Sequence, residues 1–268
     1  MAKNKKASGS HLVMIIPDVH FPIENKQAVE VTKTALAILK PTRTVFLGDM
    51  LDCGMFSTHG AKTLKELRQS NFIEEEVKPG NSFIDFAQKY TKHETAFVEG
   101  NHELRLTRWA IDHGAGAQSL YNSISPEYLL SKGRSNFKYI PYLQNNAPIL
   151  PYYPITKNLI AVHGWSASRH SAAFHLDRAK SVSVVYGHVH RQQMDSYRDP
   201  FTKERRVAFS VGCLSELQPI YMHSPSAWIW GFGLVWISQS NPKEWTEYVC
   251  NITDKGRVIL PDGSEVQV

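Results

Sequence analysis

Five short apolar segments of this chain each end in a turn that holds Asp, Asn or His. The turns read PDVH, GDMLD, GNHE, VHGW and GHVH, and they close apolar runs such as LVMII, TVFLG and VSVVYG. Short continuous apolar runs are typical of strands that are buried on both faces. Ligand clefts form at the carboxyl ends of such strands. The pattern therefore predicts an α/β fold whose polar turns gather at one edge of a sheet.

The segments between these runs predict helices, and the last part of the chain predicts antiparallel strands. Helical spacing covers residues 24–40, and residues 64–90 read as one or two helices interrupted at Lys78-Pro79-Gly80. A further helix is expected from Asn101, and another between residues 164 and 182. After His190, RRVAFSVG and WIWGFGLVWIS alternate as antiparallel strands do. Two facing sheets with helices outside would accommodate both halves.

The chain has the size and composition of one globular domain. It contains 268 residues, of which 42% are hydrophobic and 21% charged, enough to bury a sizeable core. We expect a disordered basic tail over residues 1–10 and a single domain over residues 11–268. Residues 114–154 are rich in Asn, Pro, Tyr and Gly without a clear period, so we expect a cap or an irregular insertion there.

Charge and cysteine usage limit which partners and which cellular compartment are plausible. Lys and Arg number 30 against 25 Asp and Glu, and the isoelectric point is about 9.0, so a nucleic-acid partner is electrostatically plausible. The three cysteines are far apart in sequence and indicate no disulfide framework, which favours a reducing cytoplasm. No apolar run reaches the length of a membrane span, so we expect no membrane association.

The polar turns carry a set of metal-ligating side chains. Their mixture of oxygen and nitrogen donors suits divalent ions of intermediate softness, and seven ligands are too many for one ion. A carboxylate that bridges two cations about 3.5–4 Å apart would support phosphoryl displacement, and Asp49 is the natural bridge. The candidate ligands are Asp18, His20, Asp49, Asn101, His163, His188 and His190.

These residues resemble the calcineurin-like metallophosphoesterase family. The family pattern runs Asp-x-His, Gly-Asp, Gly-Asn-His, His and Gly-His-x-His, and all five blocks occur in this order between Asp18 and His190. The resemblance implies a four-layer α-β-β-α sandwich of two mixed β-sheets flanked by helices.

The same resemblance assigns roles to the individual side chains. Asp49 would bridge the two metals, and His102 would not be a ligand but would stabilise the transition state or protonate the leaving oxygen. One metal would be held by Asp18, His20 and His190, and the other by Asn101, His163 and His188.

The loop after Asp49 helps to sort subgroups of the family. Protein Ser/Thr phosphatases carry Gly-Asp-x-x-Asp-Arg-Gly there, whereas this chain has Cys53 in place of the Arg. The ending Gly-His-x-His is similar to that of the branch with Mre11-like and SbcD-like nucleases and cyclic-nucleotide phosphodiesterases. Within that branch the chain most resembles compact enzymes encoded by bacteriophages and prophages, which would place it in the host cytoplasm.

The resulting hypothesis is a phosphodiesterase in which a metal-bridging hydroxide attacks the phosphate, with DNA as the preferred substrate. Two divalent ions are implied, with Mn²⁺ preferred and Fe²⁺, Zn²⁺ or Ni²⁺ also compatible. A phosphomonoesterase or a cyclic-nucleotide phosphodiesterase acting on nucleotides or phosphoproteins is the alternative. A binding or scaffold protein that merely keeps the fold is a third. The sequence leaves the oligomeric state and the choice between endo- and exonuclease open.

Other side chains near these motifs have two interpretations. Arg105 follows His102 at helical spacing, so it either binds substrate phosphate or belongs to an exposed helix face. Acidic residues beside the motifs are either partners of metal-bound histidines or solvated loop acids: Asp52, Glu99 and Glu103. Aromatic residues late in the chain could stack bases, but their same-face spacing favours sheet packing: Trp228, Trp230, Phe232 and Trp236.

Overall fold

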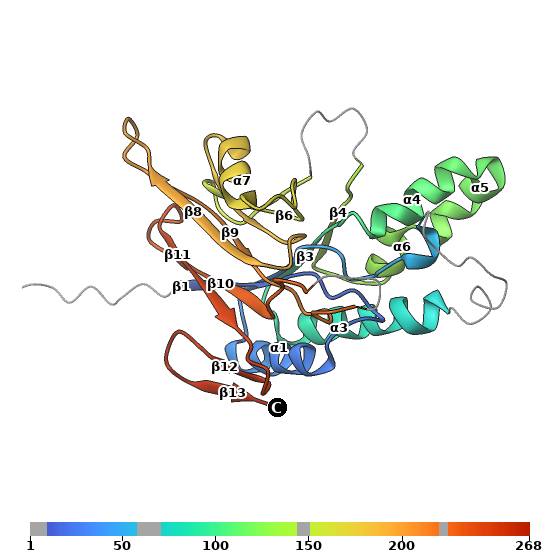
Figure 1. Cartoon of the computed structure of the whole chain (residues 1–268), viewed down its shortest axis with the longest axis horizontal. Coiled ribbons are helices and arrows are strands. Elements are labelled where there is room, and N and C mark those ends of the chain that lie inside the picture. The colour runs from blue at the N-terminus through green and yellow to red at the C-terminus, as the bar shows by residue number, and fades with distance from the viewer. Residues whose placement is uncertain (1–9, 58–70, 144–150, 220–224) are drawn as a thin grey trace, which may run out of the picture.

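The computed structural model describes residues 10–57, 71–143, 151–219 and 225–268 (Figure 1). The basic tail expected at residues 1–10 lies outside the described residues except for Ser10, which begins the first strand. None of the helices within the described ranges combines the length and the apolar character needed to cross a membrane.

The first sheet has six strands in the order β11-β10-β1-β2-β3-β4. Its parallel half, β1 to β4, carries three of the five polar turns, and β10 and β11 extend the other edge in antiparallel fashion. The strands span Ser10–Ile16 (β1), Arg43–Phe46 (β2), Glu94–Val98 (β3), Phe137–Ile140 (β4), Gly231–Ser238 (β10) and Trp245–Asn251 (β11).

The second sheet has five strands in the order β5-β6-β7-β9-β8. The central strands β6, β7 and β9 are parallel, and β5 and β8 pair antiparallel at the edges. A separate hairpin, β12–β13, ends the chain. These strands span Tyr153–Pro154 (β5), Leu159–Val162 (β6), Ser183–Tyr186 (β7), Gln192–Arg198 (β8), Arg205–Val211 (β9), Arg257–Ile259 (β12) and Glu265–Gln267 (β13).

The helices lie outside the two sheets. The chain enters helix α1 through Asn25, whose side chain accepts a hydrogen bond from the Ala28 amide, as N-cap residues do. The α-helices span Lys26–Leu39 (α1), Lys78–Tyr90 (α3), Glu103–Asp112 (α4), Gly114–Ile124 (α5), Pro126–Ser131 (α6) and Ser171–Ala179 (α7). A 3₁₀ turn spans Gly54–Phe56 (η1), and a π-helical turn spans Ile73–Val77 (η2).

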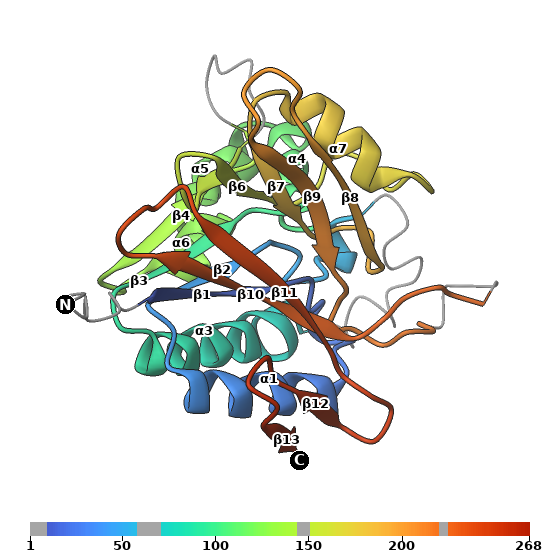
Figure 2. The same ribbon diagram turned by 90° about the vertical axis from the view of Figure 1, so that its left-hand side faces the viewer.

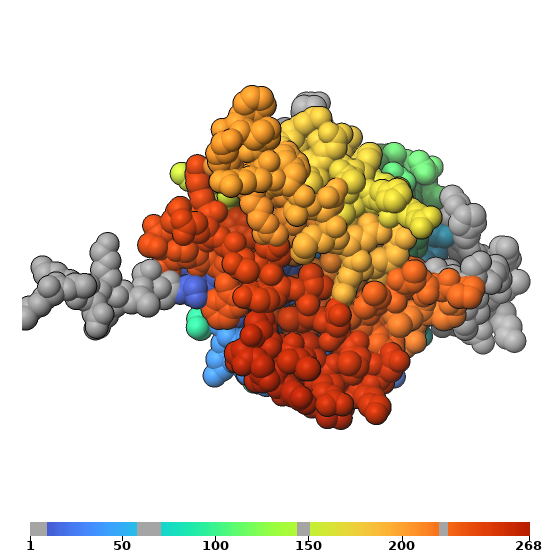
Figure 3. Space-filling view, turned by 60° about the vertical axis from the view of Figure 1, so that its left-hand side comes forward, coloured from blue at the N-terminus to red at the C-terminus, as the bar shows by residue number. Residues whose placement is uncertain are grey.

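Alternating residues of the strands build separate apolar layers. Met14 and Ile16 of β1 face α1 and α3, whereas Val13 and Ile15 face the second sheet. A third apolar layer joins the second sheet to α7 through residues such as Leu176. The layers therefore run helices, sheet, sheet, helix (Figure 2), and the predicted four-layer α-β-β-α sandwich is confirmed. The last part of the chain, from β8 to β13, makes up much of one face of the molecule (Figure 3).

Two local predictions differ from the structure. Residues 114–154 were expected to form a cap or an irregular insertion. Residues 144–150 lie outside the described part, but the rest includes α5, α6 and the sheet strands β4 and β5, so the irregular alternative is wrong and the cap stays a prediction. Only Ala117 of α5 is buried, so no apolar stripe marks this helix in the sequence. Of the helical region expected at residues 64–90, residues 64–70 lie outside the described part. At Lys78-Pro79-Gly80 the helix type changes from the π-helical turn η2 to α3, but the chain stays helical, because proline is tolerated in a first helical turn.

Candidate metal centre

The five polar turns meet at the carboxyl edges of the two sheets, as predicted. Backbone hydrogen bonds connect them: the Val19 amide donates to the Asp49 carbonyl at 3.0 Å, and the Gly187 amide donates to the His163 carbonyl at 2.7 Å. The Asp18 carboxylate accepts from the His188 amide at 2.8 Å and so ties the first sheet to the second. The turns form one connected frame.

Asp18, His20 and His190 form the first group of side chains that could hold a metal ion. The Nε2 atoms of His20 and His190 lie 3.1 Å apart, and His190 Nε2 lies 3.3 Å from Asp18 Oδ1. Ligands at about 2.1 Å from one ion are separated by roughly 3.0–3.4 Å. These buried donor atoms are therefore spaced as ligands of a single ion would be.

Asp52 orients one ligand of this group. The Nδ1 atom of His20 donates to Asp52 Oδ1 at 3.2 Å, which leaves the lone pair of Nε2 free toward His190. A carboxylate behind a histidine fixes the tautomer and the ring orientation in many metal sites. Of the two interpretations of Asp52, the structure thus favours the partner of a histidine over the solvated loop acid.

Asp49, His163 and His188 form a second group, and Asn101 lies beside it. The Nε2 atom of His163 lies 2.8 Å from Asn101 Oδ1 and 3.3 Å from Asp49 Oδ2. On the other side of the ring, His163 Nδ1 donates to the Leu47 carbonyl at 2.7 Å. The backbone bond to Nδ1 therefore holds the ring with Nε2 toward the oxygen donors.

One oxygen of Asp49 faces both groups. Its Oδ2 atom lies 3.7 Å from His20 Nε2 in the first group and 3.3 Å from His163 Nε2 in the second. The other oxygen, Oδ1, accepts a hydrogen bond from the His102 amide at 2.9 Å. Asp49 thus stands between the two groups, where a bridging carboxylate has to stand.

The charges of the site suit bound cations. Burial lowers the pKa of His20, and burial followed by the repulsion of His163 lowers the pKa of His188 to about 4, so both rings stay neutral, as metal ligands must be. Burial would raise the pKa of Asp49, but His163 and His102 hold it well below its usual range. Burial likewise opposes protonation of His163, but Asp49 outweighs it and raises that pKa to about 10. The ionised Asp49 carboxylate therefore favours a positive charge beside it, and this donor set suits divalent ions.

The backbone of the candidate ligands is strained. His20, Asp49, His188 and His190 have φ values of 57°, 48°, 70° and 53°, in the left-handed region that residues other than glycine rarely adopt. Each such residue costs on the order of 1 kcal/mol or more, and such residues cluster at functional sites. The surrounding hydrogen bonds hold the turns in a conformation that a free chain would avoid.

Glu103 holds the Asp49 loop by its backbone. Its fully buried carboxylate accepts hydrogen bonds from the amides of Asp49 (3.0 Å), Leu51 (2.9 Å) and Gly100 (3.0 Å). Sequence reasoning considered only a histidine partner or a loop acid for this residue and missed this role. The only available signal was an acidic residue beside a Gly-Asn turn. Glu99, likewise, accepts from the Tyr142 amide at 2.8 Å rather than from a histidine.

His102 lies beside the centre and is oriented by Asp52 and Arg105. Its Nδ1 atom is 2.9 Å from the Asp52 carbonyl and 3.0 Å from Asp52 Oδ1, so Nδ1 carries the proton. Arg105 donates to His102 Nε2 at 2.9 Å and to the Asp52 carbonyl at 2.8 Å. The guanidinium group of Arg105 thus contacts the site instead of lying on an exposed helix face. His102 Nε2 is 3.9 Å from Asp49 Oδ2.

The chain belongs to the calcineurin-like phosphoesterase family, whose model matches residues 11–209. No curated protein matches the chain significantly. Among solved structures, vacuolar protein sorting 29 from Cryptosporidium parvum is 14% identical with a TM-score of 0.49, covering 97% of this chain and 100% of its own. The phosphoesterase Yfce from E. coli is 16% identical with a TM-score of 0.40, covering 89% of this chain and 98% of its own.

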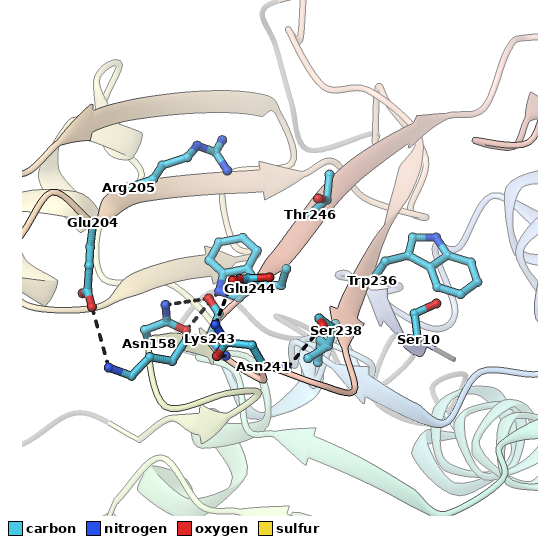
Figure 4. A pocket seen from close by; sticks show the side chains of 12 residues that line it. Ser10, Asn158, Glu204, Arg205, Trp236, Ser238, Asn241, Lys243, Glu244 and Thr246 are labelled. Carbon is cyan, nitrogen blue, oxygen red and sulfur yellow. Dashed lines mark hydrogen bonds and ion pairs between the residues drawn. The ribbon is translucent and has the colours of Figure 1, made fainter. Parts of the chain in front are cut away.

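A cavity of about 640 Å³ lies elsewhere, between the β10–β11 turn and the second sheet (Figure 4). Several of its polar side chains pair with one another: Trp245 Nε1 donates to Asn158 Oδ1 at 3.1 Å, and Lys243 lies 3.7 Å from Glu204. Ser10, at the start of β1, lines this cavity, whereas Asp18 follows the end of the same strand. A strand of this length spans about 20 Å, so the cavity is remote from the metal centre.

Gly100 lets the β2 and β3 turns approach each other, and we expect Gly100→Ala to weaken metal binding. A methyl group there would lie 2.1 Å from Asp49 Oδ1 and 2.5 Å from the Asp49 amide nitrogen. The displaced carboxylate should weaken Mn²⁺ binding by about 10- to 100-fold or more, measured by isothermal titration calorimetry.

Gly116 in α5 is the matched control, because its added methyl group would have no neighbour within 4 Å. Gly116→Ala should leave Mn²⁺ affinity unchanged and stabilise the fold by about 0.5–1 kcal/mol. Equal Mn²⁺ affinities for the two variants would contradict the proposed role of Gly100.

His175 supports the turn that carries His163 and is buried in neutral form. Its Nε2 accepts from the Trp165 amide at 2.7 Å, and its Nδ1 donates to the Ser171 carbonyl at 2.6 Å. Burial, with nearby positive charge, lowers the pKa of His175 from 6.5 to about 4. As the pH falls, His175 therefore takes up a proton near pH 6.5 in the unfolded chain but only near pH 4 in the folded chain. The stabilisation by His175 is complete above pH 6.5 and is lost as the pH falls toward 4.

We expect the advantage of the wild type over His175→Phe to shrink on acidification. The variant has no group to titrate, so the difference in free energy of unfolding should fall by about 2 kcal/mol between pH 7.5 and pH 4.5. Urea unfolding of both proteins with EDTA present measures this difference. A difference that stays constant or widens at low pH would refute the neutral, buried role.

Proposed function

We propose that this protein is a dinuclear metal-dependent phosphodiesterase that cleaves DNA. The observation that supports it most is the position of one Asp49 oxygen between two groups of ligand atoms, 3.7 Å from His20 Nε2 and 3.3 Å from His163 Nε2. Family membership supports the phosphoesterase class.

In this proposal each group of side chains would hold one divalent ion, with the Asp49 carboxylate shared between the groups. Asp18, His20 and His190 would hold the first ion, and Asn101, His163 and His188 would hold the second. When bound, the ions would supply a nucleophilic water at neutral pH and neutralise charge on the phosphate oxygens. Mn²⁺ is the preferred ion, since a mixed set of oxygen and nitrogen donors accepts it well.

His102 is the proposed general acid for the leaving oxygen. Asp52 fixes the proton on Nδ1 and leaves Nε2 facing the centre. Burial lowers the pKa of His102, but Asp49 and the hydrogen bond that Asp52 accepts outweigh it and raise the pKa. An acid catalyst needs a proton on Nε2, which Nε2 can carry once the Arg105 N–H group that it accepts here turns toward a phosphate. Proton transfer from Nε2 would leave Asp52 in place to receive the Nδ1 hydrogen bond throughout.

Arg105 is the proposed phosphate-binding residue. Its guanidinium group lies next to His102 Nε2, the atom that would approach the substrate. A guanidinium group presents several donors, so Arg105 can keep its bond to the Asp52 carbonyl while it turns one N–H toward a phosphate oxygen. This arrangement would place positive charge where the transition state gains negative charge.

DNA is the proposed substrate because the chain combines the Gly-His-x-His ending with a formal net charge of +5. The proposal includes a phage or prophage origin and action in the host cytoplasm. Phosphomonoesters and cyclic nucleotides are the competing substrates, and hydrolysis of p-nitrophenyl phosphate assayed beside DNA distinguishes the first of them.

We expect the protein to cleave single- or double-stranded DNA and bis-p-nitrophenyl phosphate when Mn²⁺ is present. His102→Ala should lower kcat by about 10²- to 10⁴-fold, because it removes general acid catalysis but no ligand. Parallel assays of labelled DNA, bis-p-nitrophenyl phosphate and p-nitrophenyl phosphate measure this effect.

His113→Ala serves as the control, since the exposed His113 lies at the end of α4, away from the ligands. It should match the wild type, and His102→Ala should bind Mn²⁺ normally. Hydrolysis of p-nitrophenyl phosphate alone would make the protein a phosphomonoesterase. Absence of Mn²⁺-dependent cleavage of any phosphodiester would refute the proposal.

A further inference from the structure

Trp228 lies against the metal centre rather than in the core. Its ring centroid is 4.1 Å from that of His190, with the two rings at 69° to each other. Trp230 and Trp236 pack against the apolar cluster between the first sheet and its helices, and Phe232 is fully buried within that cluster. In the described part of the chain, Trp228 belongs to none of the three apolar clusters.

The backbone beside Trp228 is held firmly. The Ile229 amide donates to the His190 carbonyl at 2.9 Å, and the Cys213 amide donates to the Ile229 carbonyl at 2.9 Å. These bonds tie the segment before β10 to the turn that carries His190. The backbone at the indole is therefore fixed by bonds to the segments that carry His190 and Cys213, and the half-buried ring keeps part of its surface open to solvent.

Trp165, on the His163 side of the centre, provides a contrast. Its ring stacks on His175 at 5.3 Å with an angle of 13°, and its amide is bonded to the same histidine. One face of Trp165 is thus already covered by the protein. Trp228 meets His190 at a steep angle instead, which is an edge contact and leaves an aromatic face without a parallel partner in that pair.

We infer that Trp228 binds a nucleobase of the substrate by stacking, next to the phosphate held at the first group of ligands. This inference rests on the proposed function and names the part of the substrate that the site recognises besides phosphate. Stacking on an aromatic side chain is tolerant of base identity, because every base offers a π-face. It requires an unpaired base, so the site favours single-stranded DNA or frayed ends over an intact duplex.

The test compares two oligonucleotides of equal length and charge: a fluorescein-labelled oligothymidylate and its abasic counterpart. Both present the same phosphates, so their difference in affinity isolates the bases from the salt-dependent phosphate contribution. Fluorescence anisotropy with Mn²⁺ present, in a His102→Ala background that slows cleavage, measures both dissociation constants. We expect the background protein to bind oligothymidylate about tenfold more tightly than the abasic chain.

Adding Trp228→Ala should remove this preference and leave affinity for the abasic chain unchanged. Trp228→Phe should retain most of the preference, since it keeps an aromatic face. Ile229→Ala is the matched control, because this neighbour is 39% exposed and its backbone bonds do not depend on its side chain. It should leave both affinities unchanged.

Two results would overturn the inference: a Trp228→Ala variant that still prefers oligothymidylate, or one that loses affinity for both chains equally. The second would mean that Trp228 only holds His190 in place. If the background protein shows no preference for bases while the wild type hydrolyses bis-p-nitrophenyl phosphate, the stacking inference fails and the phosphodiesterase proposal stands. If the wild type cleaves no phosphodiester, the proposed function itself fails.

Discussion

The buried carboxylate of Asp49 is the constraint on which the rest of the site depends. Its Oδ1 accepts from the His102 amide, and its Oδ2 faces His20 and His163. Its backbone carbonyl accepts from Val19 and His20, and its amide donates to Glu103. Turns after β1, β2, β3 and β6 therefore share one residue, so a shift of Asp49 would move ligands from both sheets at once.

Holding this carboxylate in the interior has an energetic cost that the site must offset. A buried anion is strongly unfavourable unless a positive partner accompanies it. The left-handed backbones of Asp49 and three neighbouring histidines add strain. Packing and hydrogen bonds offset this cost. They include the apolar layers on both sides of the first sheet and the three backbone amides that donate to Glu103. A metal-binding role gives both the buried charge and the strain a physical purpose.

The sequence predicted the parts of the fold that follow from regular patterns. Apolar runs located β1, β2, β3, β6 and β7, and alternation after His190 predicted the antiparallel strands. These patterns report burial directly. Helix α5 and strand β4 escaped prediction because α5 is mostly exposed and β4 buries only Ile140, so neither leaves an apolar pattern to detect. The chain stays helical at Lys78-Pro79-Gly80 because the turn η2 leads directly into α3, and the three residues alone do not reveal this.

The candidate site was predicted less evenly. The side chains proposed as ligands are brought together, because position at a strand end is enough to place them. Roles that depend on orientation were open: Glu103 binds backbone amides, Arg105 contacts His102, and Trp228 lies at His190 whereas Trp230 packs on the core. These two residues, with Phe232 and Trp236, share one sequence pattern, but Trp228 lies at the candidate metal centre and the other three belong to or pack on the core. The path of the chain before β10 determines this difference.

The most direct test of the account is the number and coupling of bound Mn²⁺ ions. Titration of the metal-free protein, followed by electron paramagnetic resonance, reports both quantities. We predict two ions per chain with an exchange-coupled spectrum, since ions about 3.5–4 Å apart would share the Asp49 carboxylate. One ion per chain, or two ions without coupling, would contradict a centre bridged by Asp49.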